Sequence, residues 1–171
     1  MNIALGIDPG GSGYLAVLNA DSREFVGSYA LSFFPDGQFD AQAASVWLHQ
    51  VIKDNDGVVT RCCLEEVHAI FGSSAKSTFQ FGRTFGALET FLTAVGISFK
   101  PVPPKSWQKK LWDGIKPVLK GGKLDTKAVS LSAAKKLFPL VDFRPNGCTD
   151  RCKKADDNKV DAVLIAYYSC L

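Results

Sequence analysis

Carboxylates at three widely separated places in the sequence are the residues most able to do chemistry. Asp8 ends an apolar run near the N-terminus, and Glu65 lies late in another apolar run, beside Glu66. Asp157 and Asp161 are four residues apart, which places them on one face of a helix. An ionised carboxylate in apolar surroundings is unfavourable unless a cation compensates its charge. The pattern therefore indicates a cation site assembled from distant segments.

Phosphodiester hydrolysis is the chemistry that such a set suits. Mg²⁺ prefers oxygen ligands and binds a few carboxylates together with water and substrate phosphate. Two such ions ~4 Å apart can activate a water molecule and stabilise the leaving oxygen of a phosphodiester. Four carboxylates from distant positions match that task.

Each carboxylate also has a purely structural interpretation. Asp8 precedes Pro9-Gly10 and could serve only the turn there. Strand alternation turns either Glu65 or Glu66 to the opposite face of the sheet. Acids at the start of the last helix could simply complement its dipole. Their joint occurrence favours one shared site.

Charge is distributed unevenly along the 171 residues. Residues 1–99 carry 5 Lys/Arg and 10 Asp/Glu, whereas residues 100–171 carry 15 Lys/Arg and 7 Asp/Glu. A basic half joined to an acidic half suits a protein that grips phosphates and holds cations in a carboxylate pocket. A lysine-rich solvated surface is the alternative.

The elements that must position these residues form, by apolar spacing, an α/β domain with one mixed five-stranded sheet and helices on both faces. The expected strands span 3–8, 14–18, 24–33, 58–67 and 97–102, and the expected helices span 40–53, 74–95, 105–119 with a basic loop, 125–138 and 155 onward. Short turns predict an antiparallel meander for the first three strands, and strands reached through a helix are expected to be parallel. The length suits one domain over 1–171.

Two glycines stand out in the 74–95 helix. Gly82 and Gly86 are one turn apart, where glycine lowers helix stability. They predict close approach by another helix, the sheet, a ligand or a second copy of the chain.

Three motifs, in this order, resemble the RuvC family of the ribonuclease H-like superfamily. They are Gly6-Ile7-Asp8-Pro9-Gly10, Leu64-Glu65-Glu66-Val67 and Asp157-Asn158-Lys159-Val160-Asp161-Ala162. Two more segments are similar to the phage-encoded branch of that family, namely Phe79-x-x-Gly82-Arg83-x-x-Gly86 and Pro103-Pro104-Lys105-Ser106-Trp107. The resemblance implies a ribonuclease H-like fold and a homodimeric Mg²⁺-dependent endonuclease. Its partner would be branched DNA, in which it makes paired nicks across a four-way (Holliday) junction.

The resemblance also implies roles for individual residues. Asp8 corresponds to the first metal ligand, Glu65 to the mid-chain glutamate and Asp161 to the last ligand, with Glu66 as the alternative to Glu65. Two Mg²⁺ ions per site are implied, with Mn²⁺ as a substitute.

The fourth ligand is less fixed by the motif. The family carries an acid or a histidine three or four residues before the last aspartate, where this chain has Asn158 and Asp157. Asp157 is expected because a carboxylate binds Mg²⁺ better than an amide does, and Asp156 stays open. Lys127 resembles the basic residue that the family carries close to the scissile phosphate.

Further basic and aromatic residues are expected to contact DNA, although a solvated surface is an equal interpretation for any single lysine. The candidates are Lys105, Lys109, Lys110, Lys120 and Lys123. Bacterial members of the family carry a junction-wedging aromatic residue just after the glutamate motif. The chain has His68 at that position and Phe71 three residues further on.

The remaining features of the sequence concern the location of the protein, its cysteines and an alternative function. Its apolar stretches are strand-sized, which predicts no membrane span, and its start lacks the basic region of a signal peptide. We therefore expect an intracellular, cytoplasmic protein, acting in the host cytoplasm if it is phage-encoded. Five cysteines argue against a disulfide framework, although Cys148 and Cys152 could supply half of a zinc site. A nuclease for flaps, RNA–DNA hybrids or branched DNA in general is the alternative function, because its metal chemistry would be the same.

Overall fold

A mixed five-stranded sheet forms the centre of the computed structural model, which describes residues 1–66 and 74–171. The strand order is β3-β2-β1-β4-β5, with β1 (Asn2–Asp8), β2 (Tyr14–Asn19), β3 (Phe25–Ala30), β4 (Val58–Glu65) and β5 (Lys100–Val102). The first three strands are antiparallel, and β4 and β5 run parallel to β1. The predicted mixed sheet is therefore confirmed.

Two strands are shorter than the apolar pattern predicted. The segment expected over 24–33 pairs only as far as Ala30, and Phe33 makes an isolated bridge to Phe39 instead. The segment expected over 97–102 pairs only from Lys100. Pro101 lies within this edge strand, where a residue without a backbone N–H is tolerated.

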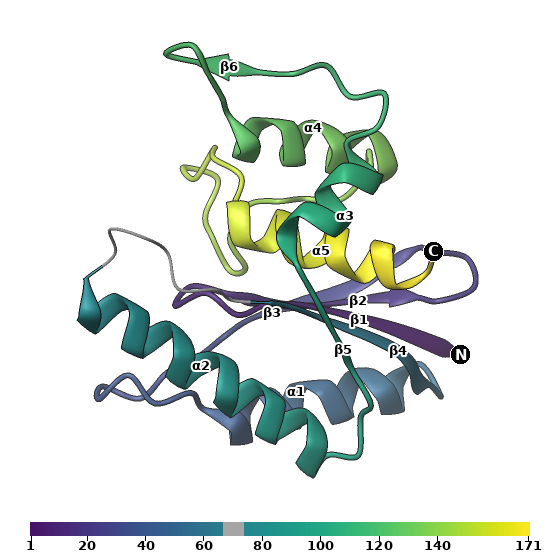
Figure 1. The fold of residues 1–171 in the computed structure, drawn as a ribbon. Helices are drawn as coiled ribbons and strands as arrows, with labels where there is room; N and C mark the ends of the chain where they lie inside the picture. Colours follow the sequence, from purple (N-terminus) through teal and green to yellow (C-terminus); the bar gives the residue numbers. More distant parts are fainter. Residues whose placement is uncertain (67–73) are drawn as a thin grey trace.

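Helices cover both faces of the sheet, as the sequence predicted (Figure 1). One face carries α1 (Ala41–Asp54) and α2 (Ala75–Ala94), and the other carries α5 (Asp157–Ser169), flanked by α3 (Pro104–Leu111) and α4 (Thr126–Leu137). Side chains of Asp40, Ser74, Asp125 and Asp156 accept hydrogen bonds from the first turns of α1, α2, α4 and α5. Among the described residues, no helix combines the length and apolar character that crossing a membrane requires.

The short helix and basic loop predicted over 105–119 are confirmed, and a small hairpin follows them directly. Helix α3 ends at Leu111, and β6 (Leu119–Lys120) pairs with β7 (Lys123–Leu124). Gly121 and Gly122 join them with φ values of 59° and 77°. A two-residue hairpin turn with both central residues in the left-handed region favours glycine, and strands of two residues are too short to show a period.

The approach of α5 to β1 depends on Gly6. A Cβ atom at this position would collide with backbone atoms of Ala162 and Ala166 in α5. The helix therefore lies directly on the strand that ends in Asp8. By contrast, no atom lies within 4 Å of a Cβ built on Gly82 or Gly86. For the described residues, the predicted approach of another helix or the sheet to these two glycines is wrong.

Candidate metal centre

Strand alternation places Asp8 and Glu65 on the face of the sheet that α5 covers. Ile7 and Leu64 are register partners in the parallel β1–β4 pair, and both pack into the core under α1 and α2. The next residue of each strand therefore faces the other way. Asp8 and Glu65 are consequently neighbours at the carboxyl ends of adjacent strands. Glu65, and not Glu66, occupies the position that faces α5.

Asp161 reaches the same place from the second turn of α5. Its Oδ1 atom is buried and has no hydrogen-bond partner among the described residues. A buried carboxylate oxygen without a donor is unfavourable unless a cation or water compensates it. The chemistry of this oxygen therefore suits an electropositive group.

Burial holds the pKa of all three carboxyl groups above the ordinary range, and neighbouring carboxylate charges add to the effect at Asp8 and Asp161. Burial, together with the charges of Glu65 and Asp161, raises the pKa of Asp8 well above its usual value, although the Gly10 N–H donates to Asp8 Oδ1 over 3.1 Å. Burial raises the pKa of Asp161 to about 7, with the neighbouring Ser130 hydroxyl acting in the opposite direction. Burial also raises the pKa of Glu65. Buried, mutually repelling carboxylates are the donor set that a hard divalent cation neutralises.

The Asp8, Glu65 and Asp161 side chains are close enough for charge interactions, but they do not surround a common point as a complete set of ligands. Within residues 1–66 and 74–171, no three His, Cys, Asp or Glu side chains already stand around a common point as metal ligands. Cys148 and Cys152 belong to no such group of metal ligands among the described residues. All five cysteines are free thiols. Asp8, Glu65 and Asp161 fit Mg²⁺ by their chemistry, their burial and the unpartnered oxygen of Asp161.

Trp107 is a residue whose part in the centre the sequence did not reveal. Its side chain is fully buried, and its indole Nε1 donates to Glu65 Oε1 over 2.9 Å. This bond links α3 to the end of β4 across 42 residues of chain. The ring packs in the hydrophobic core on the α5 side of the sheet. The hydrogen bond adds a second role, because it fixes the orientation of the Glu65 carboxylate.

Replacing Trp107 with Phe is expected to lower metal affinity or cleavage by about 10- to 100-fold, which is typical for the loss of a group that orients a metal ligand. Trp112 provides the matched control, since it packs edge-on against Trp107 at 6.3 Å and its Nε1 has no partner among the described residues. Trp112→Phe should leave metal affinity unchanged. Mg²⁺ titration followed by thermal unfolding of both variants makes the comparison. Equal losses in the two variants would show that only packing matters.

Two lysines hold Asp157 beside the three carboxylates. Lys127 Nζ lies 2.9 Å from Asp157 Oδ2, and Lys154 Nζ lies 4.0 Å from the same oxygen. The hydrogen bond to Asp157 and its charge raise the pKa of Lys127, and the Asp161 charge adds to the effect. Lys127 is therefore a cation at the edge of the centre.

The alternatives for the fourth ligand have other roles in the structure. Asp156 caps α5, and its Oδ2 also accepts from the Tyr14 hydroxyl over 3.1 Å. The amide of Asn158 donates to Ser12 Oγ over 2.7 Å. Asp157 is thus the acidic neighbour of Asp161 that is not committed to capping the helix.

The predicted DNA-contacting lysines fall into separate groups. Lys120 lines a groove of about 470 Å³ with Lys127, Lys154 and Asp157, and Lys123 is its partner in the β6–β7 hairpin. Other candidates lie on α3, where Lys105 is exposed in the first turn. Lys109 and Lys110 line a different cavity, beyond Trp107. His68 and Phe71 lie outside the described residues.

Comparison with known proteins identifies solved structures that have a similar fold. No protein-family model and no curated protein matches the sequence. Among solved structures, Thermus thermophilus RuvC in complex with a Holliday junction substrate is similar, with a TM-score of 0.62 and 14% identity. The alignment covers 97% of this chain and 90% of that one. A second Thermus thermophilus RuvC structure has a TM-score of 0.60 at 14% identity, with coverage of 96% and 90%. The chain therefore has the ribonuclease H-like fold that these proteins share.

Proposed function

We propose that this chain is a Mg²⁺-dependent endonuclease that cuts four-way DNA junctions. The observation that carries the proposal is the meeting of Asp8, Glu65 and Asp161, from three distant segments, with raised pKa values at one end of the sheet. The similarity of the fold to that of RuvC, which was solved with a Holliday junction, supports this choice of substrate.

The proposed roles follow from the contacts. Asp8, Glu65 and Asp161 would hold Mg²⁺, with Asp157 as the fourth ligand and Trp107 orienting Glu65 through its indole N–H. Bound divalent ions activate water and stabilise the leaving oxygen in phosphodiester hydrolysis. Lys127, next to Asp157, would neutralise charge on the scissile phosphate.

The basic hairpin extends this centre into a surface for DNA. Lys120 and Lys123 face each other across the β6–β7 pair, and Lys120 shares the groove that Lys127 and Asp157 border. Lysines in such positions contact phosphates without reading sequence. We propose that these residues hold the strand that is cut.

Paired nicks require two centres, so the proposal includes a homodimer. Among the described residues Asp8 is the one buried acidic residue, and the half-buried Glu65 and Asp161 lie beside it, so each chain would supply one centre. Helix α2 offers a surface for a second copy, because Phe79 is 72% exposed and nothing in the described chain covers Gly82 or Gly86. Exposed aromatic side chains of this size are typical of interaction surfaces.

The test is cleavage of an end-labelled four-way junction in Mg²⁺, beside linear duplex, flap and RNA–DNA hybrid. Symmetric paired nicks confined to the junction are the expected result. If flaps or hybrids are cut as well as the junction, the metal centre would still be supported. The function would then be that of a nuclease for flaps, hybrids or branched DNA in general. No cutting of any substrate, with Mg²⁺ or Mn²⁺ present, would contradict the proposal.

A further inference from the structure

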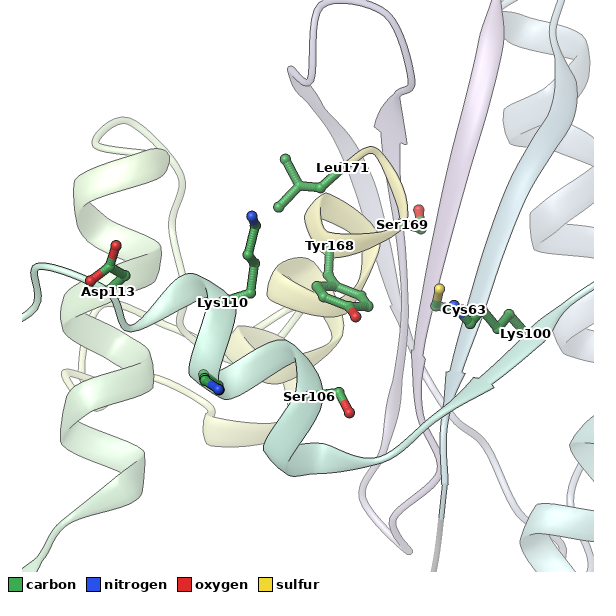
Figure 2. A pocket seen from close by; sticks show the side chains of 9 residues that line it. Cys63, Lys100, Ser106, Lys110, Asp113, Tyr168, Ser169 and Leu171 are labelled. Atoms are coloured by element: carbon green, nitrogen blue, oxygen red, sulfur yellow. The ribbon is translucent and has the colours of Figure 1, made fainter.

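A cavity of about 790 Å³ opens at the end of α5 that is remote from the carboxylates. Strands β4 and β5 form one wall, α3 forms another, and the last turn of α5 closes the third side (Figure 2). Its lining consists of Cys63, Lys100, Ser106, Lys109, Lys110, Asp113, Tyr168, Ser169 and Leu171. A volume of this size is typical of sites for small organic ligands.

Helix α3 lies between this cavity and the metal centre and contributes side chains to both. Trp107 and Leu111 point into the core, where Trp107 holds Glu65. Ser106 and Lys110 are one turn apart and therefore lie on another face, which lines the cavity. The metal centre and the cavity are thus two sites on opposite sides of one short helix.

The charge of the cavity is predominantly positive. Lys100 comes from β5, whereas Lys109 and Lys110 come from the last turn of α3. No ion pair joins any of the three to a carboxylate among the described residues, and Asp113 is the one acidic side chain in the lining. The α3 dipole can account for Lys109 and Lys110, but it does not account for Lys100.

Hydrogen-bond donors accompany these charges. Ser106 and Tyr168 bring hydroxyl groups to the lining, whereas the Ser169 hydroxyl donates to the Ala166 carbonyl oxygen within α5. Figure 2 shows Lys110 and Tyr168 in the space between α3 and α5. Lys100 is the register partner of Cys63 in the parallel β4–β5 pair, which places both residues at the floor of the cavity. Ammonium and hydroxyl donors together are the groups that bind phosphate oxygens.

We infer that this cavity is a second phosphate-binding site, which takes a nucleotide phosphate remote from the one that is cut. The inference rests on the proposed function. From Asp161 to Ser169, α5 rises by about 12 Å. Phosphates of one strand follow at about 3.4 Å along a duplex, so a phosphate roughly three or four nucleotides from the cut would reach the cavity. The backbone of the bound DNA is the source that this spacing favours, and a free nucleotide is the other.

The salt dependence of junction binding tests the inference. Lys100→Ala and Lys110→Ala should each reduce the slope of log K against log salt by about 0.9, and the double variant by about 2. Lys53→Ala, an exposed lysine in the last turn of α1 on the other face of the sheet, is the control and should keep the wild-type slope.

Modified junctions identify the source of the phosphate. Neutral methylphosphonates about three or four nucleotides from the cut should lower the wild-type slope and leave the double variant unchanged. If the double variant and the wild type have equal slopes of log K against log salt and the wild type still cuts junctions, the cavity does not bind DNA phosphate. The proposed function would then stand. Failure of the wild type to bind any junction would instead remove the proposed function. Thermal stabilisation by a deoxynucleoside monophosphate that is lost in the double variant, with equal DNA slopes, would assign the cavity to a free nucleotide.

Discussion

Asp8→Asn is expected to abolish junction cleavage while DNA binding persists. The substitution keeps the shape of the side chain and removes one negative charge from the centre. A metal ion contributes several kcal/mol to the transition state, so a weakened site should slow cleavage by at least about 10³-fold. Single-turnover cleavage and gel-shift titration of the same preparation measure the two properties. DNA binding should persist because the basic groove and hairpin are untouched.

A stability measurement separates this effect from misfolding. Without metal, Asp8→Asn should raise the melting temperature, because the buried Asp8 carboxyl no longer repels Glu65 and Asp161. Mg²⁺ should stabilise the wild type and not the variant. Asp54→Asn, at an exposed position that ends α1, is the control and should match the wild type in every assay. Full cleavage by Asp8→Asn would exclude this site as the catalytic centre.

The metal-free protein is expected to lose stability as the pH rises from about 4 to about 7. Asp161 has a pKa of about 7 in the folded protein, against 3.8 for the unperturbed group. Between these values the folded state holds a proton that the unfolded state has released. The free energy of unfolding therefore falls by about 1.4 kcal/mol per pH unit, on the order of 4 kcal/mol in all. Denaturant unfolding in EDTA across pH 4–8 measures the slope.

Asp161→Asn should remove its own share of this slope, while the raised pKa values of Asp8 and Glu65 keep a smaller fall. The metal-free variant should be more stable than the wild type at pH 8. Because Mg²⁺ binds the ionised carboxylates, its stabilising effect on the wild type should be larger at pH 8 than at pH 5.5. Asp142→Asn is a suitable control, because the pKa of this exposed carboxyl is lowered to about 2 by hydrogen bonds from Arg144. A wild-type profile that rises steadily with pH would contradict the raised pKa of Asp161.

The sequence predicted the sheet better than the connections. Strands β1, β2 and β4 are long apolar runs, and α2 repeats its apolar residues over five turns, so periodicity identifies them. The β6–β7 hairpin has two residues per strand, and its form depends on the left-handed glycines rather than on any period. The late start of β5 at Lys100 depends on where its pairing with β4 begins, which the apolar pattern does not register.

The candidate site was predictable where strand geometry decides it. Asp8 and Glu65 are adjacent because parallel register and alternation put them there. The bond from Trp107 to Glu65 and the pairing of Lys127 with Asp157 depend on how α3 and α4 pack, and residue type alone does not show this. The resemblance pointed to Lys127, while Lys154 became visible only as a second cation at the same carboxylate.

The contact at Gly6 bears on how this centre could be moved to another protein. Since Gly6 meets backbone atoms of α5, the separation of strand and helix is set by a missing methyl group and by two alanines, Ala162 and Ala166. It does not depend on a particular interlocking of large side chains. A designer grafting the site onto a different scaffold should therefore first install that glycine opposite a pair of small helical residues. The carboxylates can be added afterwards, and the surrounding apolar residues can be chosen freely for volume.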